Sequence, residues 1–233
     1  YDFRSAWEAV VEPWLRDMAE RPWNQPPGAV LVPSRTYAQF LKSRMATAGL
    51  AAIGLSFLTP GECWKQLHAR LPKARAAASR EELHLLLSTA AETFPNHPTA
   101  RAVAADPAPL MRALDQLAAS GRPYEALAIE ALSPVVRSFE SRLADAGLAA
   151  AQTLDGELLA ATRTGMRAWG PLLIIGFDGS HWPLWTLLQA AAAGSTAAAV
   201  VLFEPRLAGE MIDQIWIDSW EEASGEARPV SRG

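Results

Sequence analysis

Four short apolar runs, each followed by a turn and then by residues at helical spacing, constrain the fold of this chain more than any other feature. Continuous apolar runs of this kind are typical of strands covered on both faces, and their alternation with helices indicates a parallel sheet. Hydrophobic residues make up 50% of the 233 positions, enough for a sizeable core. The sequence therefore predicts an α/β fold. The four runs span residues 29–32, 53–58, 172–175 and 197–203.

Helix start signals divide the chain into three parts. Ser34 is placed to cap a helix over 35–48, and the capping box Thr59-Pro60-Gly61-Glu62 predicts a helix from Pro60 to about residue 71. Between residues 80 and 169 the spacing predicts helices and no strand. The expected organisation is a first part of an α/β domain at 1–79, an all-helical insertion at 80–169 and a second part of the α/β domain at 170–233.

Two helices of the later chain are predicted in more detail. Pro134 lies inside the helical pattern over 123–146 and is expected to split that helix. The segment 211–220 is amphipathic, with core packing as the default and docking on a partner as the alternative. Its apolar side is predicted to carry Met211, Ile212, Ile215, Trp216 and Trp220.

Basic residues are concentrated in one part of the chain. The net charge of −4 is too small to indicate a partner. Between Pro22 and Arg80, however, Glu62 is the single acidic residue among eight basic ones. A one-sided distribution favours a polyanionic partner such as nucleic acid, although solvated helix faces produce the same pattern. The eight are Arg35, Lys42, Arg44, Lys65, Arg70, Lys73, Arg75 and Arg80.

The motifs of several common enzyme classes do not occur in the sequence. There is no G-x-x-x-x-G-K-[ST] phosphate loop, no G-x-G-x-x-G after a strand and no G-x-S-x-G elbow. The four histidines lack metal-binding spacing and the single cysteine, Cys63, excludes a cysteine-based zinc cluster, so we predict no metal and no cofactor. One cysteine and no apolar run of membrane-spanning length indicate a cytoplasmic protein. Because the chain begins with Tyr1, we expect it to be a piece of a longer protein.

Three strand–turn–helix segments resemble a known family. They read GAVLVPSRTYAQFL at 28–41, LSFLTPGECWKQL at 55–67 and LLIIGFD at 172–178. In this order they resemble the first RecA-like domain of the UvrD/RecB helicase group. The likeness extends to its inactivated version, the N-terminal part of AddB-like subunits of helicase–nuclease complexes, where "GF" replaces the acidic pair of the Walker B motif. The resemblance implies a parallel RecA-like (P-loop NTPase-like) sheet with a large all-helical insertion.

The resemblance implies a DNA-binding scaffold without motor activity. At the degenerate Walker B position stand Gly176 and Phe177, which cannot coordinate magnesium, with Asp178 next. The implied function is an ATPase-inactive helicase-like region of an AddB-type nuclease subunit, in DNA end processing and double-strand break repair. Its implied partners are single-stranded or duplex-end DNA and an AddA-like helicase–nuclease subunit. We assign no catalytic residue to this region, because the family places its nuclease core in a C-terminal domain.

In that family the loops after the first two motif strands contact single-stranded DNA. The matching loops here are 34–37 and 59–61. Hydroxyls, amides at helix N-termini and arginine suit phosphate groups, and aromatic rings suit bases. The resulting DNA-binding residues are Ser34, Arg35, Thr36, Tyr37, Thr59, Trp64 and Lys65.

Other interpretations of the same residues stay open at this point. Thr59 can serve only as a helix cap, and Trp64 can belong to the core. The chain can also be an active superfamily 1 helicase that lacks its phosphate loop, although Gly176 and Phe177 argue against this. A small-molecule α/β enzyme that uses the turn at 178–181, or a pure interaction module, are further alternatives.

Overall fold

The computed structural model describes residues 3–22, 24–51, 53–72, 74–119, 124, 127, 129–203 and 211–228. The chain divides into two compact units. The first, here called the sheet unit, consists of Tyr1–Arg70 and Ala161–Gly233, and the second, the helical unit, consists of Leu71–Ala160. The boundaries set from the sequence, after residues 79 and 169, lie further along the chain.

The sheet unit is built on a four-stranded parallel sheet with the strand order β2-β1-β5-β6. The α/β class and the parallel sheet predicted from the sequence are therefore confirmed. Both central strands are buried along their whole length, which explains why they read as continuous apolar runs. The strands are β1 (Gly28–Leu31), β2 (Leu55–Leu58), β5 (Pro171–Ile175) and β6 (Ala197–Val201).

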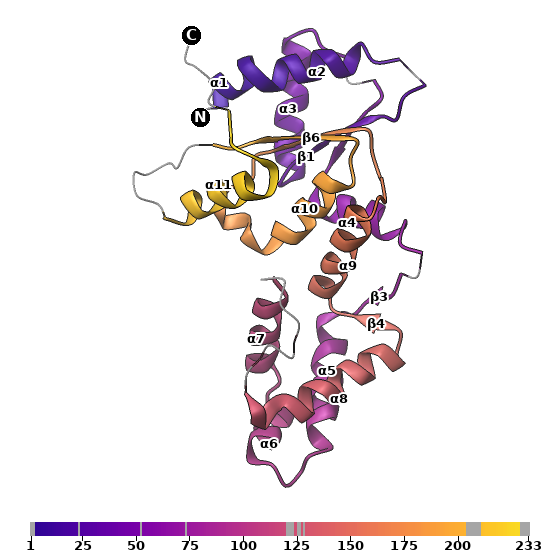
Figure 1. The fold of residues 1–233 in the computed structure, drawn as a ribbon, viewed down its shortest axis with the longest axis vertical. Helices are drawn as coiled ribbons and strands as arrows, with labels where there is room; N and C mark the ends of the chain where they lie inside the picture. The colour runs from indigo at the N-terminus through magenta and orange to yellow at the C-terminus, as the bar shows by residue number, and fades with distance from the viewer. Residues whose placement is uncertain are drawn as a thin grey trace. The chain divides into compact units, whose positions relative to one another are not determined.

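Helices cover both faces of this sheet (Figure 1). On one face, apolar side chains of α2 and α3 such as Leu15, Leu41 and Met45 form a buried cluster with Val30 and Leu173 of the central strands. The opposite face is covered by α4, α10 and α11 (Figure 1). The helices are α1 (Phe3–Ala6), a π-helical segment (Trp7–Val11), α2 (Glu12–Ala19), α3 (Arg35–Thr47), α4 (Pro60–His68), a 3-10 helix (Gly179–Leu184), α10 (Trp185–Ala193) and α11 (Met211–Ser224).

The helical unit has its own core, in which Leu87, Met111 and Phe139 are fully buried. It also contains a parallel two-stranded ribbon, so the prediction of no strand between 80 and 169 is wrong. Strands of two residues leave no periodic pattern that a sequence could show. Its elements are β3 (Ala76–Ala77), α5 (Arg80–Glu92), α6 (Pro98–Ala105), α7 (Ala108–Ala119), a 3-10 turn (Glu130–Leu132), α8 (Ser133–Asp145), β4 (Leu148–Ala149) and α9 (Ala151–Arg163), which ends in the sheet unit.

Two predicted helices differ from the observed ones. The helix expected over 123–146 begins at Ser133 and keeps Pro134 in its first turn, where proline is tolerated; residues 120–123 lie outside the described residues. In α11, Trp216 and Trp220 are buried against other tryptophans while Met211, Ile212 and Ile215 are exposed, so core packing is confirmed for the two tryptophans and wrong for the other three. Among the described helices, none combines the length and the apolar character needed to cross a bilayer.

Candidate functional site

The carboxyl ends of the four parallel strands meet at one edge of the sheet, which is where ligands bind in open α/β folds. There β1 leads into α3, β2 into α4, and β5 into the 3-10 helix. Because β1 lies between β2 and β5, the two predicted DNA-binding loops are neighbours of residues 176–178, which the resemblance assigns to a degenerate Walker B position. We call residues 33–37, 59–65 and 176–181 the edge site.

The β1–α3 loop exposes its polar residues. Ser34 has an extended backbone, and its hydroxyl oxygen accepts a hydrogen bond of 3.2 Å from the Tyr37 N–H, which caps α3. Ser34, Arg35 and Thr36 are exposed, and 87% of the Arg35 side chain is accessible. Its guanidinium Nη2 lies 3.8 Å from Oε1 of Glu62 on α4, a long and exposed ion pair that holds the arginine weakly. The loop therefore offers a cation that is free to move.

The Tyr37 ring packs against the start of the β5 exit loop. Gly176 has a φ of +90°, and a β-carbon at this position would come 2.8 Å from Cζ of Tyr37 and 3.1 Å from Cδ of Pro33. The ring also meets Phe40 edge-on, with 6.0 Å between the centroids. Burial raises the pKa of Tyr37 to about 12. Tyr37 thus links two loops of the edge site, a role that the sequence alone did not suggest.

The β2–α4 loop is closed by its own acidic residue. Oε2 of Glu62 accepts hydrogen bonds from the Thr59 N–H at 2.9 Å and from the Thr59 hydroxyl at 2.8 Å. These bonds, the backbone one first, hold the pKa of Glu62 below its ordinary value. The Thr59 hydroxyl proton is therefore already used within the loop.

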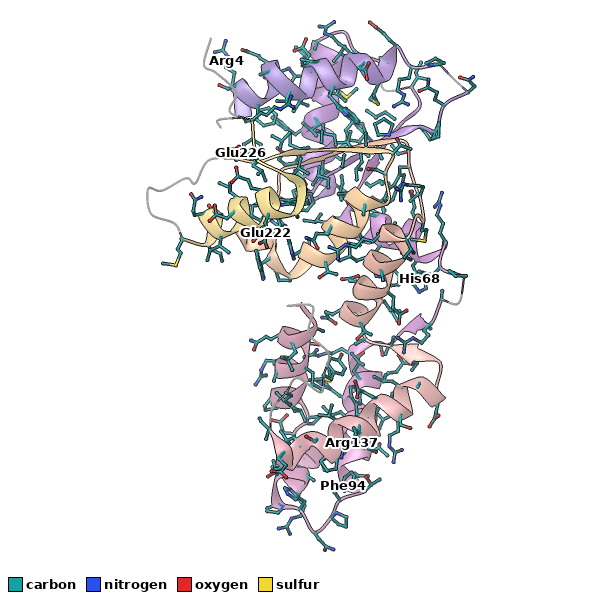
Figure 2. All side chains as sticks on the ribbon, in the orientation of Figure 1. Arg4, His68, Phe94, Arg137, Glu222 and Glu226 are labelled. Carbon is teal, nitrogen blue, oxygen red and sulfur yellow. The ribbon has the colours of Figure 1, made fainter. Side chains whose placement is uncertain are left out.

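Two further predicted residues lie on the first turns of α4. Trp64 is half-buried and stacks on His68, with 4.4 Å between the ring centroids and an interplanar angle of 14°. His68 is labelled in Figure 2. Lys65 is exposed. One of the two predicted residues, Lys65, therefore reaches solvent freely, while the ring of Trp64 is occupied on one face.

The exit of β5 contains no free carboxylate. Phe177 is 4% exposed and its ring meets His181 edge-on. Asp178 caps the 3-10 helix by accepting hydrogen bonds from the N–H and the hydroxyl of Ser180, and it lies 2.9 Å from Nδ1 of His181. Burial acts to raise the pKa of Asp178, but the hydrogen bonds from Ser180 and His181 bring it below its ordinary value. The hydrogen bonds of the Asp178 carboxylate therefore stabilise its own turn.

The serine, histidine and aspartate of this turn do not form a hydrolytic triad. Such a triad needs the nucleophile and the carboxylate on opposite nitrogens of the imidazole ring. Here Ser180 Oγ lies 3.3 Å, and Asp178 Oδ1 2.9 Å, from the same Nδ1 of His181. Over the part of the chain that the structure describes, no three His, Cys, Asp or Glu residues are grouped so that they could hold a metal ion.

The described basic residues of the 22–80 segment belong to both units. Arg75 and Arg80 belong to the helical unit, where each pairs with a carboxylate. Lys42 and Arg44 lie on α3 over aromatic rings, and Lys73 is outside the described residues. Within the sheet unit, the described basic residues of this segment are therefore shared between α3 and the α4 region. The edge site holds two members of the segment, Arg35 and Lys65.

The packing of Tyr37 on Gly176 was not visible in the sequence pattern. The available signal was a glycine directly after a buried strand, which marks either a turn or a close approach. Which residue makes that approach depends on the pairing of β1 with β5, and strand order is not encoded locally. Compared with models of known protein families and with curated proteins, the chain gives no match.

Proposed function

We propose that this chain is an ATPase-inactive, helicase-like region of an AddB-type nuclease subunit, a DNA-binding scaffold in DNA end processing and double-strand break repair. In this proposal the parallel sheet is RecA-like, and the helical unit is the insertion between its second and third motif segments. The proposal is supported by the motif order of the sequence and by the adjacency of β2, β1 and β5. An AddA-like helicase–nuclease subunit is the proposed protein partner.

The geometry after β5 supports the absence of motor activity. An active helicase needs a carboxylate at this strand end to hold the magnesium shell and another to orient water. Gly176 has no side chain, and the Tyr37 ring occupies the space into which one would extend. Phe177 is buried and apolar, and the Asp178 carboxylate is bound within its own turn. A purified chain is expected to hydrolyse ATP no faster than a blank, and hydrolysis above the blank would contradict this part of the proposal.

One observation carries the DNA-binding part of the proposal. The starts of α3 and α4 lie beside each other on neighbouring strands, with the exposed Arg35 between them. Amide groups at helix N-termini and arginine side chains are frequent partners of phosphate oxygens. The first turn of α3 contains no acidic residue that would compete with a phosphate. Single-stranded or duplex-end DNA is therefore the proposed ligand of the edge site.

The test is the binding of a labelled single-stranded oligonucleotide, measured by fluorescence anisotropy over a range of salt concentrations. Arg35→Ala should weaken binding several-fold and reduce the slope of log K against log salt by about 0.7, because one phosphate contact is lost. Arg70→Ala is the matched control. It also removes one exposed positive charge, but Arg70 follows the C-terminal end of α4, at the opposite edge of the sheet. Equal effects of the two substitutions would contradict the proposed site.

A further inference from the structure

The backbone at the exit of β5 leaves space for a side chain of the neighbouring loop. Gly176 combines a φ of +90° with a position at which a β-carbon would lie 2.8 Å from Cζ of Tyr37. Contacts below 3.0 Å are essentially never made by real β-carbons. Any other residue at 176 would therefore have to displace the Tyr37 ring or move the strand exit.

The same tyrosine also takes part in the cap of the loop that precedes it. Its N–H donates the hydrogen bond that caps α3 through the Ser34 hydroxyl, at 3.2 Å. Arg35 and Thr36 lie between these two bonded residues. A displacement of Tyr37 that also moves its backbone N–H would therefore disturb this cap and the backbone that carries Arg35.

We propose that the absence of a side chain at Gly176 makes room for the Tyr37 ring, and that this contact positions the loop carrying Arg35. Tyr37 is thus a positioning residue and need not touch a ligand itself. The statement that this loop meets DNA rests on the proposed function, whereas the contact between Tyr37 and Gly176 does not. The edge site then depends on the close fit of one residue in the first turn of α3 and one residue directly after β5, and the absence of a side chain at 176 has a structural role.

Gly176→Ala tests the contact against Gly49→Ala as a matched control. Gly49 also has a positive φ, +69°, but a β-carbon there would meet nothing within 4 Å. Both substitutions strain the backbone, and only the first one disturbs Tyr37. The readout is NMR titration of tyrosine labelled at Cζ, together with the amide resonances of residues 34–37.

In the wild type the Tyr37 ring should resist ionisation up to a pKa of about 12, because it is partly buried. Gly176→Ala should shift this pKa toward 10 and move the amide resonances of the loop, and Gly49→Ala should do neither. An unchanged titration of Tyr37 in Gly176→Ala would overturn the proposal. If Gly176→Ala does not fold, Tyr37→Ala tests the positioning role instead. It should move the amide resonances of the loop before it, and unchanged resonances would overturn the proposal.

DNA affinity adds a second test. Tyr37→Phe keeps the ring and should keep wild-type affinity, whereas Tyr37→Ala should lose several-fold. Introducing Gly176→Ala into Tyr37→Ala should add no more than Gly49→Ala adds; full additivity would overturn the contact. If the wild type does not bind the oligonucleotide, the proposed function fails, and the NMR titration still decides whether Gly176 holds Tyr37.

Discussion

The β1–α3 and β2–α4 segments have the same architecture, yet they leave different groups available to a ligand. Each consists of a strand, an extended capping residue and a helix. In the first, Ser34 caps the helix and the exposed Arg35 follows. In the second, Glu62 takes both the N–H and the hydroxyl hydrogen bond of Thr59.

This difference shows how one acidic residue changes the use of a helix start. A capping box satisfies the free donors of a helix N-terminus from within the chain, so fewer are left for an anion. A cap without that acid leaves donors and an arginine in solvent. We therefore expect the β1–α3 loop to dominate any contact with phosphate, and the β2–α4 loop to contribute mainly through Lys65.

The largest effect is expected where the β1–α3 loop rests on the β5 exit. Gly176→Asp should lower the free energy of unfolding by roughly 3 kcal/mol, since it combines the cost of a positive φ with overpacking against Tyr37. It should not create ATPase activity. Urea denaturation measures the first effect and a phosphate-release assay the second. A loss below about 1 kcal/mol would mean that the loop does not depend on this contact.

A smaller effect is expected from removing the capping hydroxyls, and it should differ between Ser34 and Thr59. Ser34→Ala should cost about 1 kcal/mol in the free energy of unfolding, because the Tyr37 N–H loses its acceptor. It should also weaken DNA binding, since the cap shapes the loop that carries Arg35. Thr59→Ala should leave DNA binding nearly unchanged, because the Thr59 hydroxyl proton is directed at Glu62. A stronger binding defect in Thr59→Ala than in Ser34→Ala would reverse the comparison.

Removing the charge of Glu62 should make the β2–α4 loop resemble the β1–α3 loop. Glu62→Gln keeps the shape of the side chain and removes the charge that faces Arg35 and Thr59. We expect DNA affinity to rise about two-fold, a change of roughly 0.4 kcal/mol. Anisotropy titrations at low salt provide the measurement. Weaker binding in this variant would indicate that Glu62 orients Arg35 toward the ligand.

A further difference between the two loops appears as pH dependence, at opposite ends of the pH scale. Tyr37 has a raised pKa of about 12, so the unfolded chain ionises first and stability should fall between about pH 10 and 12. Glu62 has a lowered pKa, so its contribution is present above its ordinary value of 4.5 and is lost as the pH falls below it. Urea midpoints against pH should show the alkaline loss shrink in Tyr37→Phe, with a remainder from Tyr124, whose pKa is also raised by burial, and the acid loss shrink in Glu62→Gln.

The class of fold and the capping of both helices could be predicted because they depend on local patterns. β1 and β5 are buried apolar runs, and Ser34 and the box at 59–62 are capping signals that a short window contains. The two-residue strands β3 and β4 were missed because they leave no pattern. The division of the basic residues between both units and the contact between Tyr37 and Gly176 depend on which segments become neighbours in space, and residue spacing does not determine that.

The strand order has a consequence for how this protein folds during its synthesis on the ribosome. Ala29 pairs with Ser56 on one side, but on the other it pairs with Leu172, far downstream in the nascent chain. The helical unit is one contiguous stretch and can collapse as soon as it emerges. The central strand β1, in contrast, keeps one edge unpaired until translation has passed the helical unit, and such long-range pairing is intrinsically slow. During that interval the unpaired edge of β1 is open to pairing with other chains.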